Sequence, residues 1–285
     1  MMKMKKRFNY RKLIIVLSIF MVIGGLVIVL NHYGSSDSLP DYPRYEKKIL
    51  EKVIDLEDVY LGKIDGETER ELFLQTGLGR IGIDEIRKLS SSENEFKEVL
   101  LEFQEQLFSG EGEKRLIDLK TGDVLVSMSQ RLCFYPHGHA AIVIDGDTNQ
   151  ILEARSYQAG SCVCKQSKWS NLHSFVVLRV KEDVIEALLN EGYENPTKGA
   201  AIYAAENLMG LKYSLLKDIR VLNDEKPEYT QCAQLVWYAY FKAGLDIDEN
   251  RGIIVRPKDF LSSDVLEVVQ VFGIEPDKLL KMRNE

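Results

Sequence analysis

The chain has 285 residues, of which 45% are hydrophobic and 28% are charged. These proportions are those of a globular protein with a sizeable core, and they exclude a disordered or low-complexity chain. The net charge of −7 also argues against nucleic acid as a partner, because proteins that bind nucleic acid present a basic surface.

The N-terminus predicts a membrane anchor. The first twelve residues carry six bases and no acid, and Leu13–Leu30 is an apolar run interrupted only by Ser18, Gly24 and Gly25. At about 1.5 Å per residue, a helix of this length nearly crosses the hydrocarbon core of a bilayer. The basic flank predicts a cytoplasmic N-terminus and an extracytoplasmic body. A cleaved signal peptide is the alternative, although the run does not end in a small-residue cleavage site.

Four segments are expected along the chain. Residues 1–30 form the cytoplasmic tail and transmembrane anchor, 31–40 a polar stalk, 41–115 a helical region, and 116–285 the main domain. In the helical region, two apolar stripes at helical spacing predict core-facing helices. They are Ile49, Val53, Leu56 and Tyr60, and then Phe96, Leu100, Phe103 and Leu107. Ser92 and Glu95 predict a capping box before the second stripe, and Gln75–Arg80 is expected to be a turn.

After Gly110 the pattern changes to strands. Residues 139–145 and 150–155 flank Gly-Asp-Thr-Asn, which predicts a hairpin. Further strands are expected at 124–126, 174–180 and 266–271, and helices at 197–209 and 231–243. Because the strands come as a block with helices before and after, the predicted fold class is α+β, with an antiparallel sheet packed on helices.

Cys232 is a candidate nucleophile. A polar, structure-breaking stretch precedes it, so it is expected in the first turn of a helix. Backbone N–H groups and the helix dipole stabilise a thiolate there, and the thiolate is the form that attacks. By position alone, a buried structural cysteine is the commoner explanation.

His139 and Glu153 are candidate partners of that thiol. His139 opens the first strand of the hairpin, and its ring has the ordinary pKa that suits a general base. Glu153 lies among apolar residues in the return strand, where an acid needs a partner. Pairing across the hairpin would bring the carboxylate beside the imidazole and orient it. Each residue alone also fits an ordinary structural role.

A zinc site is a competing interpretation of the same region. Cys133, His137, His139, Cys162 and Cys164 are all zinc ligands in other proteins, but their spacings lack the usual Cys-x2-Cys pair. Packing or one disulfide would equally explain Cys162 and Cys164, with Cys133 as a partner, since a bridge within Cys-x-Cys is strained. No metal or organic cofactor is expected.

Taken together, residues from about 116 to 272 resemble the circularly permuted branch of the NlpC-type, papain-like cysteine peptidases. The matching pieces are Leu119–Leu125, Gly138–Val143, Leu152–Ala154, Trp169, Val177–Val180, Gly210–Ser214 and Gln231–Trp237. In the permuted branch the histidine strand precedes the cysteine helix, as it does here. The Gln-Thr-Gly-Leu-Gly piece is similar to an N-terminal extension seen with some of these domains.

The resemblance implies a papain-like fold with Cys232 as nucleophile, His139 as base and Glu153 as the third member. It also implies that Tyr213 lines the active site, and Gln231 or Tyr213 is expected to assist the oxyanion. The expected activity is thiol-dependent hydrolysis of amide bonds in cell-wall peptides by a single-pass membrane protein. The alternatives are a lipid-directed acyltransferase or thioesterase on the same fold, and an inactive domain that binds wall or membrane components.

Overall fold

The computed structural model describes residues 41–110, 114–128, 131–132, 135–136, 138–215, 217, 226–248 and 250–284. Within these ranges, no helix is both long enough and apolar enough to cross a membrane. The predicted anchor Leu13–Leu30 and the predicted stalk 31–40 lie outside the described residues.

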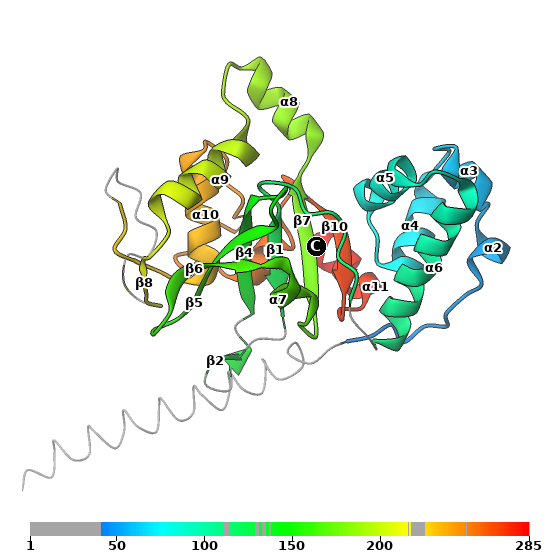
Figure 1. Cartoon of the computed structure of the whole chain (residues 1–285), viewed down its shortest axis with the longest axis horizontal. Coiled ribbons are helices and arrows are strands. Elements are labelled where there is room, and N and C mark those ends of the chain that lie inside the picture. Colours follow the sequence, from blue (N-terminus) through cyan, green and yellow to red (C-terminus); the bar gives the residue numbers. More distant parts are fainter. Residues whose placement is uncertain are drawn as a thin grey trace, which may run out of the picture.

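A six-stranded antiparallel sheet occupies the middle of the molecule (Figure 1). Its strand order is β10-β7-β1-β4-β5-β6. The strands are β1 (Val124–Ser127), β4 (His139–Asp145), β5 (Gln150–Ser156), β6 (Gly160–Lys165), β7 (Phe175–Val180) and β10 (Leu266–Phe272). Two further pairs of short strands form separate two-stranded sheets: β2 (Arg131–Leu132) with β3 (Tyr135–Pro136), and β8 (Lys212–Tyr213) with β9 (Tyr229–Thr230). The predicted hairpin is confirmed as β4 and β5.

Helices come before, between and after the strands. The N-terminal group is α2 (Leu50–Val53), α3 (Leu56–Tyr60), α4 (Gly66–Thr76), α5 (Arg80–Leu89) and α6 (Glu93–Ser109). The later ones are α7 (Gln166–Ser170), α8 (Glu182–Asn190), α9 (Pro196–Asn207), α10 (Cys232–Lys242) and α11 (Pro276–Asn284), with a 3-10 turn η1 (Pro257–Phe260). The α+β class predicted from the sequence is therefore confirmed.

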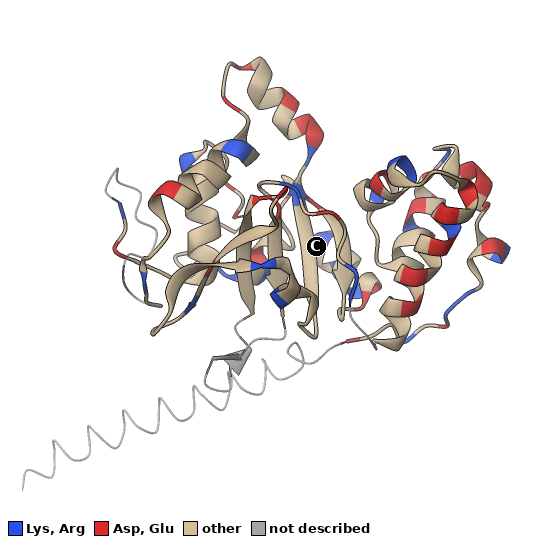
Figure 2. Cartoon of the chain, viewed as in Figure 1, with Lys and Arg blue, Asp and Glu red and all other residues tan. Residues whose placement is uncertain are grey.

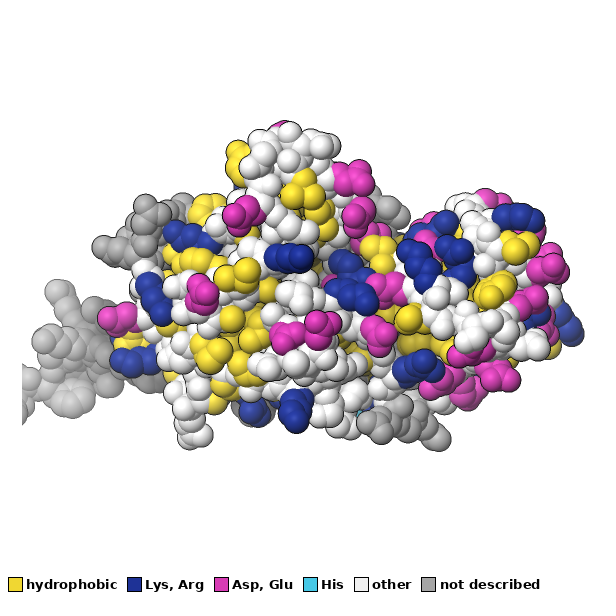
Figure 3. Space-filling model, turned by 45° about the horizontal axis from the view of Figure 1, so that its top comes forward, with side chains coloured by type: hydrophobic (Ala, Val, Ile, Leu, Met, Phe, Trp, Pro, Cys, Tyr) yellow, Lys and Arg dark blue, Asp and Glu magenta, His cyan; other side chains and the backbone are white. Residues whose placement is uncertain are grey.

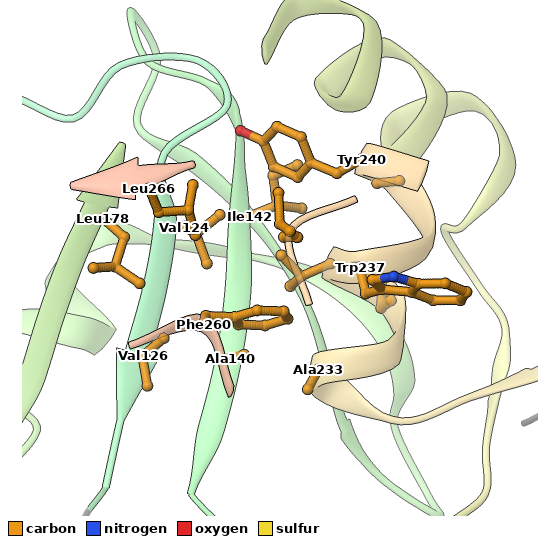
Figure 4. Close-up of a cluster of buried hydrophobic side chains, with 14 of the residues drawn as sticks. Val124, Val126, Ala140, Ile142, Leu178, Ala233, Trp237, Tyr240, Phe260 and Leu266 are labelled. Atoms are coloured by element: carbon orange, nitrogen blue, oxygen red, sulfur yellow. The ribbon is translucent and has the colours of Figure 1, made fainter. Parts of the chain in front are cut away.

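One face of the sheet packs on α9 and α10. Figure 4 shows Val124, Ala140 and Ile142 of the sheet facing Trp237 and Tyr240 of α10. The Tyr240 hydroxyl donates to the backbone oxygen of Gly122, so this buried polar group is satisfied. Since α10 rests on β4, the helix that begins at Cys232 is held against the strand that begins at His139.

The opposite face packs on the N-terminal helices. Leu125 and Val177 of the sheet share a buried cluster with Phe96 and Phe103 of α6. Leu119, on the connection between the two parts, belongs to the same cluster. The helical region 41–115 is thus joined to the sheet by a common hydrophobic core. Figure 2 shows many acidic residues along its helices.

The first predicted apolar stripe is wrong at Ile49 and Val53, although Leu56 and Tyr60 do pack on the core. The chain forms two short helices there, α2 and α3, and the Asp55 side chain accepts hydrogen bonds from the N–H groups of Glu57 and Asp58 as the cap of α3. This break changes which residues face inward: Ile49 and Val53 are 58% and 45% exposed. Leu50, Ile54 and Val59 are buried instead, while Leu56 of the predicted stripe is buried as expected.

The second stripe is confirmed. Phe96, Leu100, Phe103 and Leu107 all lie on the buried face of α6. Ser92 accepts from the N–H of Glu95 at 3.3 Å, as a capping box requires. The return bond differs from the prediction, because the Glu95 carboxylate accepts from the N–H of Ser91 at 2.7 Å.

The predicted turn between α4 and α5 has a second role at the edge of the sheet. The N–H of Gly79 donates to the oxygen of Val269 at 3.0 Å, and the N–H of Val271 donates to the oxygen of Gly77 at 2.7 Å. Leu78 forms a bridge with Gln270 between these two bonds. The segment therefore covers part of the free edge of β10, and edge strands need such cover.

Replacement of Gly79 by alanine is expected to loosen this junction. A Cβ at Gly79 would lie 1.8 Å from the oxygen of Val268, so one backbone segment must move. We expect the free energy of unfolding, measured with urea, to fall by about 3 kcal/mol. Gly66→Ala is the matched control: a Cβ there meets nothing within 4 Å, and the change should be neutral or slightly stabilising. Equal effects of the two substitutions would contradict this account.

A buried ion-pair network also ties α5 to the sheet. Arg179 contacts both carboxylate oxygens of Asp123 at 2.7 Å and Glu85 at 2.7 Å. Burial raises the pKa of the Asp123 carboxyl, an effect that Arg179 opposes. Asp123 and Arg179 therefore link α5 to the sheet. Their role is structural, and they do not belong to the candidate active site.

A cavity of about 490 Å³ lies where α4, β10 and α11 meet. On the face drawn in Figure 3, basic, acidic and apolar side chains are intermixed. Asp277 of the cavity wall pairs with Arg70 at 3.1 Å and with Lys281 at 2.7 Å. None of the three candidate catalytic residues lines this cavity.

Candidate active site

Cys232 is the first residue of α10, as predicted. Helix α10 presents its first backbone N–H groups and the positive end of its dipole around this residue. The side chain is buried. The N-terminus of a helix stabilises negative charge, so this position favours the thiolate of Cys232 over the thiol.

His139 begins β4 and is buried at that end of the strand. Gly138, with a φ of +71°, turns the chain into the strand immediately before it. The ring Nε2 lies 2.9 Å from Oε2 of Glu153. Cys232 is among the groups that raise the pKa of His139, so its sulfur lies near the ring. Since Nε2 faces the carboxylate, Nδ1 is the ring nitrogen left for the thiol.

The hairpin register explains how Glu153 reaches His139. Glu153 pairs with Ala141 across the two strands, so His139 is its diagonal neighbour on the same face. Glu153 is 0% exposed, and burial of a carboxylate demands compensation. His139 takes Oε2, while Lys168 and Arg155 both contact Oε1. The prediction that the return strand places an acid beside the imidazole is confirmed.

The pKa shifts of this group favour an imidazolium. Burial lowers the pKa of His139, but hydrogen bonds and charges from Cys232 and Glu153 outweigh it and raise the value to about 9. Burial raises the pKa of Glu153, whereas His139 and then Lys168 bring it down to about 2. The carboxylate therefore stays ionised at neutral pH and holds a proton on the ring. A thiolate beside a protonated ring is the reactive form of a nucleophilic cysteine.

Tyr213 lies beside this group. It ends β8, which pairs with β9 just before Cys232. Burial raises the pKa of the Tyr213 phenol, and the charge of Cys232 raises it further. The phenol therefore stays protonated and can donate a hydrogen bond close to the sulfur. Tyr157 packs edge-on against it, with ring centroids 5.2 Å apart.

Gln231 holds the start of α10. Its side-chain oxygen accepts from the N–H of Ala233 at 2.9 Å, so it is the N-cap. Its amide nitrogen donates to the oxygen of Val255 at 2.7 Å. The Cys232 sulfur lies 3.5 Å from the same side-chain oxygen. The structure thus gives Gln231 a positioning role, and help to the oxyanion stays a prediction.

Trp169, Lys168 and Arg155 were not assigned roles from the sequence. The Trp169 ring stacks on the His139 ring, with centroids 5.6 Å apart and planes 14° apart. This contact shields one face of the imidazole from water and fixes its plane. The one available signal was the acid at Glu153, because a buried carboxylate predicts cationic partners without identifying them.

The remaining cysteines give no support to the zinc interpretation. Cys162 and Cys164 lie on β6 as free thiols. Burial and the charge of Glu153 raise the pKa of Cys164 to about 12, which opposes reaction at that sulfur. Cys133 and His137 lie outside the described residues. Within those residues, no group of three His, Cys, Asp or Glu side chains has the arrangement of a metal site.

No comparison with known proteins indicates a function, so the geometry of the site is the main basis for inferring one. The chain matches no protein-family model, no curated protein and no solved structure.

Proposed function

We propose that this protein is a thiol hydrolase that cleaves amide bonds by a Cys232–His139–Glu153 triad on a permuted papain-like fold. The observation that carries the proposal is the bridging position of His139. One ring nitrogen pairs with the buried Glu153, and Cys232 lies close enough to the ring to raise its pKa. A nucleophile, a base and an orienting group in this order are the constellation of acyl transfer.

The geometry suggests the following steps. The Cys232 sulfur attacks the amide carbonyl carbon, while His139 keeps the proton it has taken from the thiol. The backbone N–H of Cys232 is the expected donor to the oxyanion, and Tyr213 is placed to add a second hydrogen bond. His139 then gives its proton to the leaving amine, and a thioester remains on Cys232. Water activated by His139 hydrolyses the thioester, which releases the acid and restores the thiol.

The proposed substrate is a peptide of the cell wall. This part rests on the predicted anchor Leu13–Leu30 and its basic flank, from which an extracytoplasmic body is expected. The likeness of the motifs around His139 and Cys232 to wall-directed peptidases supports the same substrate. The proposed location is the cell membrane, with the helical region and the sheet on the extracytoplasmic side.

The test uses the full chain in detergent and two classes of substrate in parallel. Soluble peptidoglycan fragments are incubated with the wild type and with Cys232→Ala, and new amine and carboxylate ends are identified by mass spectrometry. A phospholipid with an acceptor alcohol or amine is treated in the same way. We expect new ends from the wall peptides that depend on Cys232. Transfer of acyl chains between lipids, with intact wall peptides, would replace this proposal by the acyltransferase alternative.

A further inference from the structure

A cavity of about 520 Å³ opens beside His139. It lies between the start of β4, the turn that joins β5 to β6, and α7. The described residues that line it are His139, Arg155, Ser156, Gln158, Ala159 and Lys168. Two of these side chains, Arg155 and Lys168, are basic, and none of the described lining residues is acidic.

Positive charge exceeds negative charge at this cavity. Arg155 and Lys168 share a single oxygen of Glu153, whose other oxygen pairs with His139. One carboxylate therefore faces three basic groups. Even when Cys232 is a thiolate, the group of five keeps one positive charge. The chain as a whole is acidic, with a net charge of −7, so this excess is local.

Arg155 points its charge towards solvent at the cavity wall. Its side chain is 50% exposed, against 29% for Lys168 and 0% for Glu153. The contact with Glu153 uses Nε at 3.4 Å. The two terminal nitrogens of the guanidinium form the planar fork that binds carboxylate or phosphate oxygens. Lys168 is held deeper by its ion pair with Glu153 and adds to the same field.

We propose that Arg155, supported by Lys168, makes this cavity select substrates that carry a carboxylate or phosphate group next to the scissile bond. The inference rests on the proposed function, because the bond to be cut must lie at Cys232. Arg155 is then a specificity-determining residue: it attracts a substrate carboxylate or phosphate into the cavity beside His139. An uncharged substrate of the same shape gains nothing from this contact.

The experiment compares two alkylating reagents on the full chain. In both reactions the Cys232 sulfur displaces iodide, but iodoacetate is an anion and iodoacetamide is neutral. The modification rate at Cys232 is followed by peptide mass spectrometry, which separates it from the other cysteines. The readout is the ratio of the iodoacetate rate to the iodoacetamide rate. Dividing by the same ratio for 2-mercaptoethanol removes the intrinsic reactivity of the reagents.

We expect Arg155→Gln to lower this ratio by about three- to tenfold at low ionic strength, because one positive charge at the cavity beside His139 is lost. Arg155→Lys should keep most of the preference because it keeps the charge. Arg44→Gln is the matched control, since Arg44 is a highly exposed arginine that pairs only locally with Asp41. Its ratio should equal that of the wild type.

The outcomes separate this inference from the proposed function. An Arg155→Gln ratio equal to the wild-type ratio, with Cys232 still reactive, would overturn the anion selectivity and leave the hydrolase proposal standing. A Cys232 that reacts with neither reagent in the folded wild type would remove the hydrolase proposal itself. The extent to which acetate or inorganic phosphate slows the reaction of Cys232 with iodoacetamide then identifies the anionic group of the substrate. Stronger Arg155-dependent protection by acetate supports a carboxylate, and stronger protection by inorganic phosphate supports a phosphoryl group.

Discussion

Cys232→Ala is expected to reduce amide hydrolysis by about 10³-fold or more, because it removes the atom that forms the covalent intermediate. The protein should still fold. The side chain is buried at the start of α10, and loss of one sulfur atom there is expected to cost only about 1 kcal/mol of stability. Initial rates on the wall peptide that the wild type cleaves fastest, together with urea unfolding, measure both effects.

The control for this substitution is Cys162→Ala. Cys162 is a partly exposed free thiol on β6, and it pairs across the strand with Glu153. Its replacement should change hydrolysis by less than about threefold. If Cys232→Ala kept a tenth or more of wild-type activity, the sulfur of Cys232 would not be the nucleophile. A comparable loss in Cys162→Ala would point to damage of the strand instead.

Glu153→Gln is expected to lower kcat/KM by about 10²- to 10³-fold, because the ring of His139 loses the carboxylate that orients it and keeps it protonated. Glu153 raises the pKa of His139, which stands at about 9 in the wild type. Without the carboxylate that pKa falls, so the alkaline limb of the pH profile should move to lower pH. A pH series of kcat/KM for both proteins measures the shift.

The same substitution should also reduce stability. It leaves His139, Lys168 and Arg155 around a neutral amide, and we expect a loss of about 1 to 3 kcal/mol at neutral pH. The pKa of Glu153 is lowered in the folded state to about 2. Its contribution is therefore complete above the unfolded pKa and disappears as pH falls towards 2. The stability difference between wild type and Glu153→Gln should shrink in the same direction.

Glu186→Gln controls for removal of an acid as such. Glu186 is an exposed residue of α8. It should leave the pH profile unchanged and alter stability by less than about 0.5 kcal/mol. An unshifted alkaline limb in Glu153→Gln would mean that Glu153 serves only packing, and the account of the triad would lose its third member.

Local sequence patterns predicted the elements that carry the site. The β4–β5 hairpin was predicted because a four-residue turn separates two apolar runs, and its alternation placed Ala141 and Val143 on the face of His139. Both belong to the cluster shared with the N-terminal helices. Helix α10 was predicted because a polar stretch precedes an apolar segment that ends at Gly244. The hairpin prediction brings His139 and Glu153 together, whereas the packing of α10 on β4 was expected from the family resemblance alone.

Contacts between distant segments could not be predicted. The stacking of Trp169 on His139 and the ion pair of Lys168 with Glu153 depend on how α7 folds back after β6. Helix α7 has five residues, too few for a periodic pattern. Gly77 and Gly79 indicate a turn in the sequence. Their contact with β10 could not be predicted, because that strand lies almost two hundred residues later.

The stripe at Ile49 failed for a different reason. Four apolar residues at helical spacing predict one amphipathic helix, but Asp55 in their midst is a strong N-cap residue. The chain uses that cap to begin α3, and the break rotates the buried face to Leu50 and Val59. Periodicity therefore predicted helical structure there and the burial of Leu56, but it was wrong for Ile49 and Val53.

The reactivity of Cys232 at mildly acidic pH tests the central claim most directly. The folded full chain is treated with iodoacetamide at about pH 6, where an ordinary thiol with a pKa near 8.5 is almost wholly protonated. Modification of each cysteine is then followed by mass spectrometry. The triad predicts that Cys232, beside a protonated His139, is alkylated at least about tenfold faster than Cys162 and Cys164, and that His139→Ala removes the difference. A Cys232 that reacts no faster than Cys162 would contradict the account.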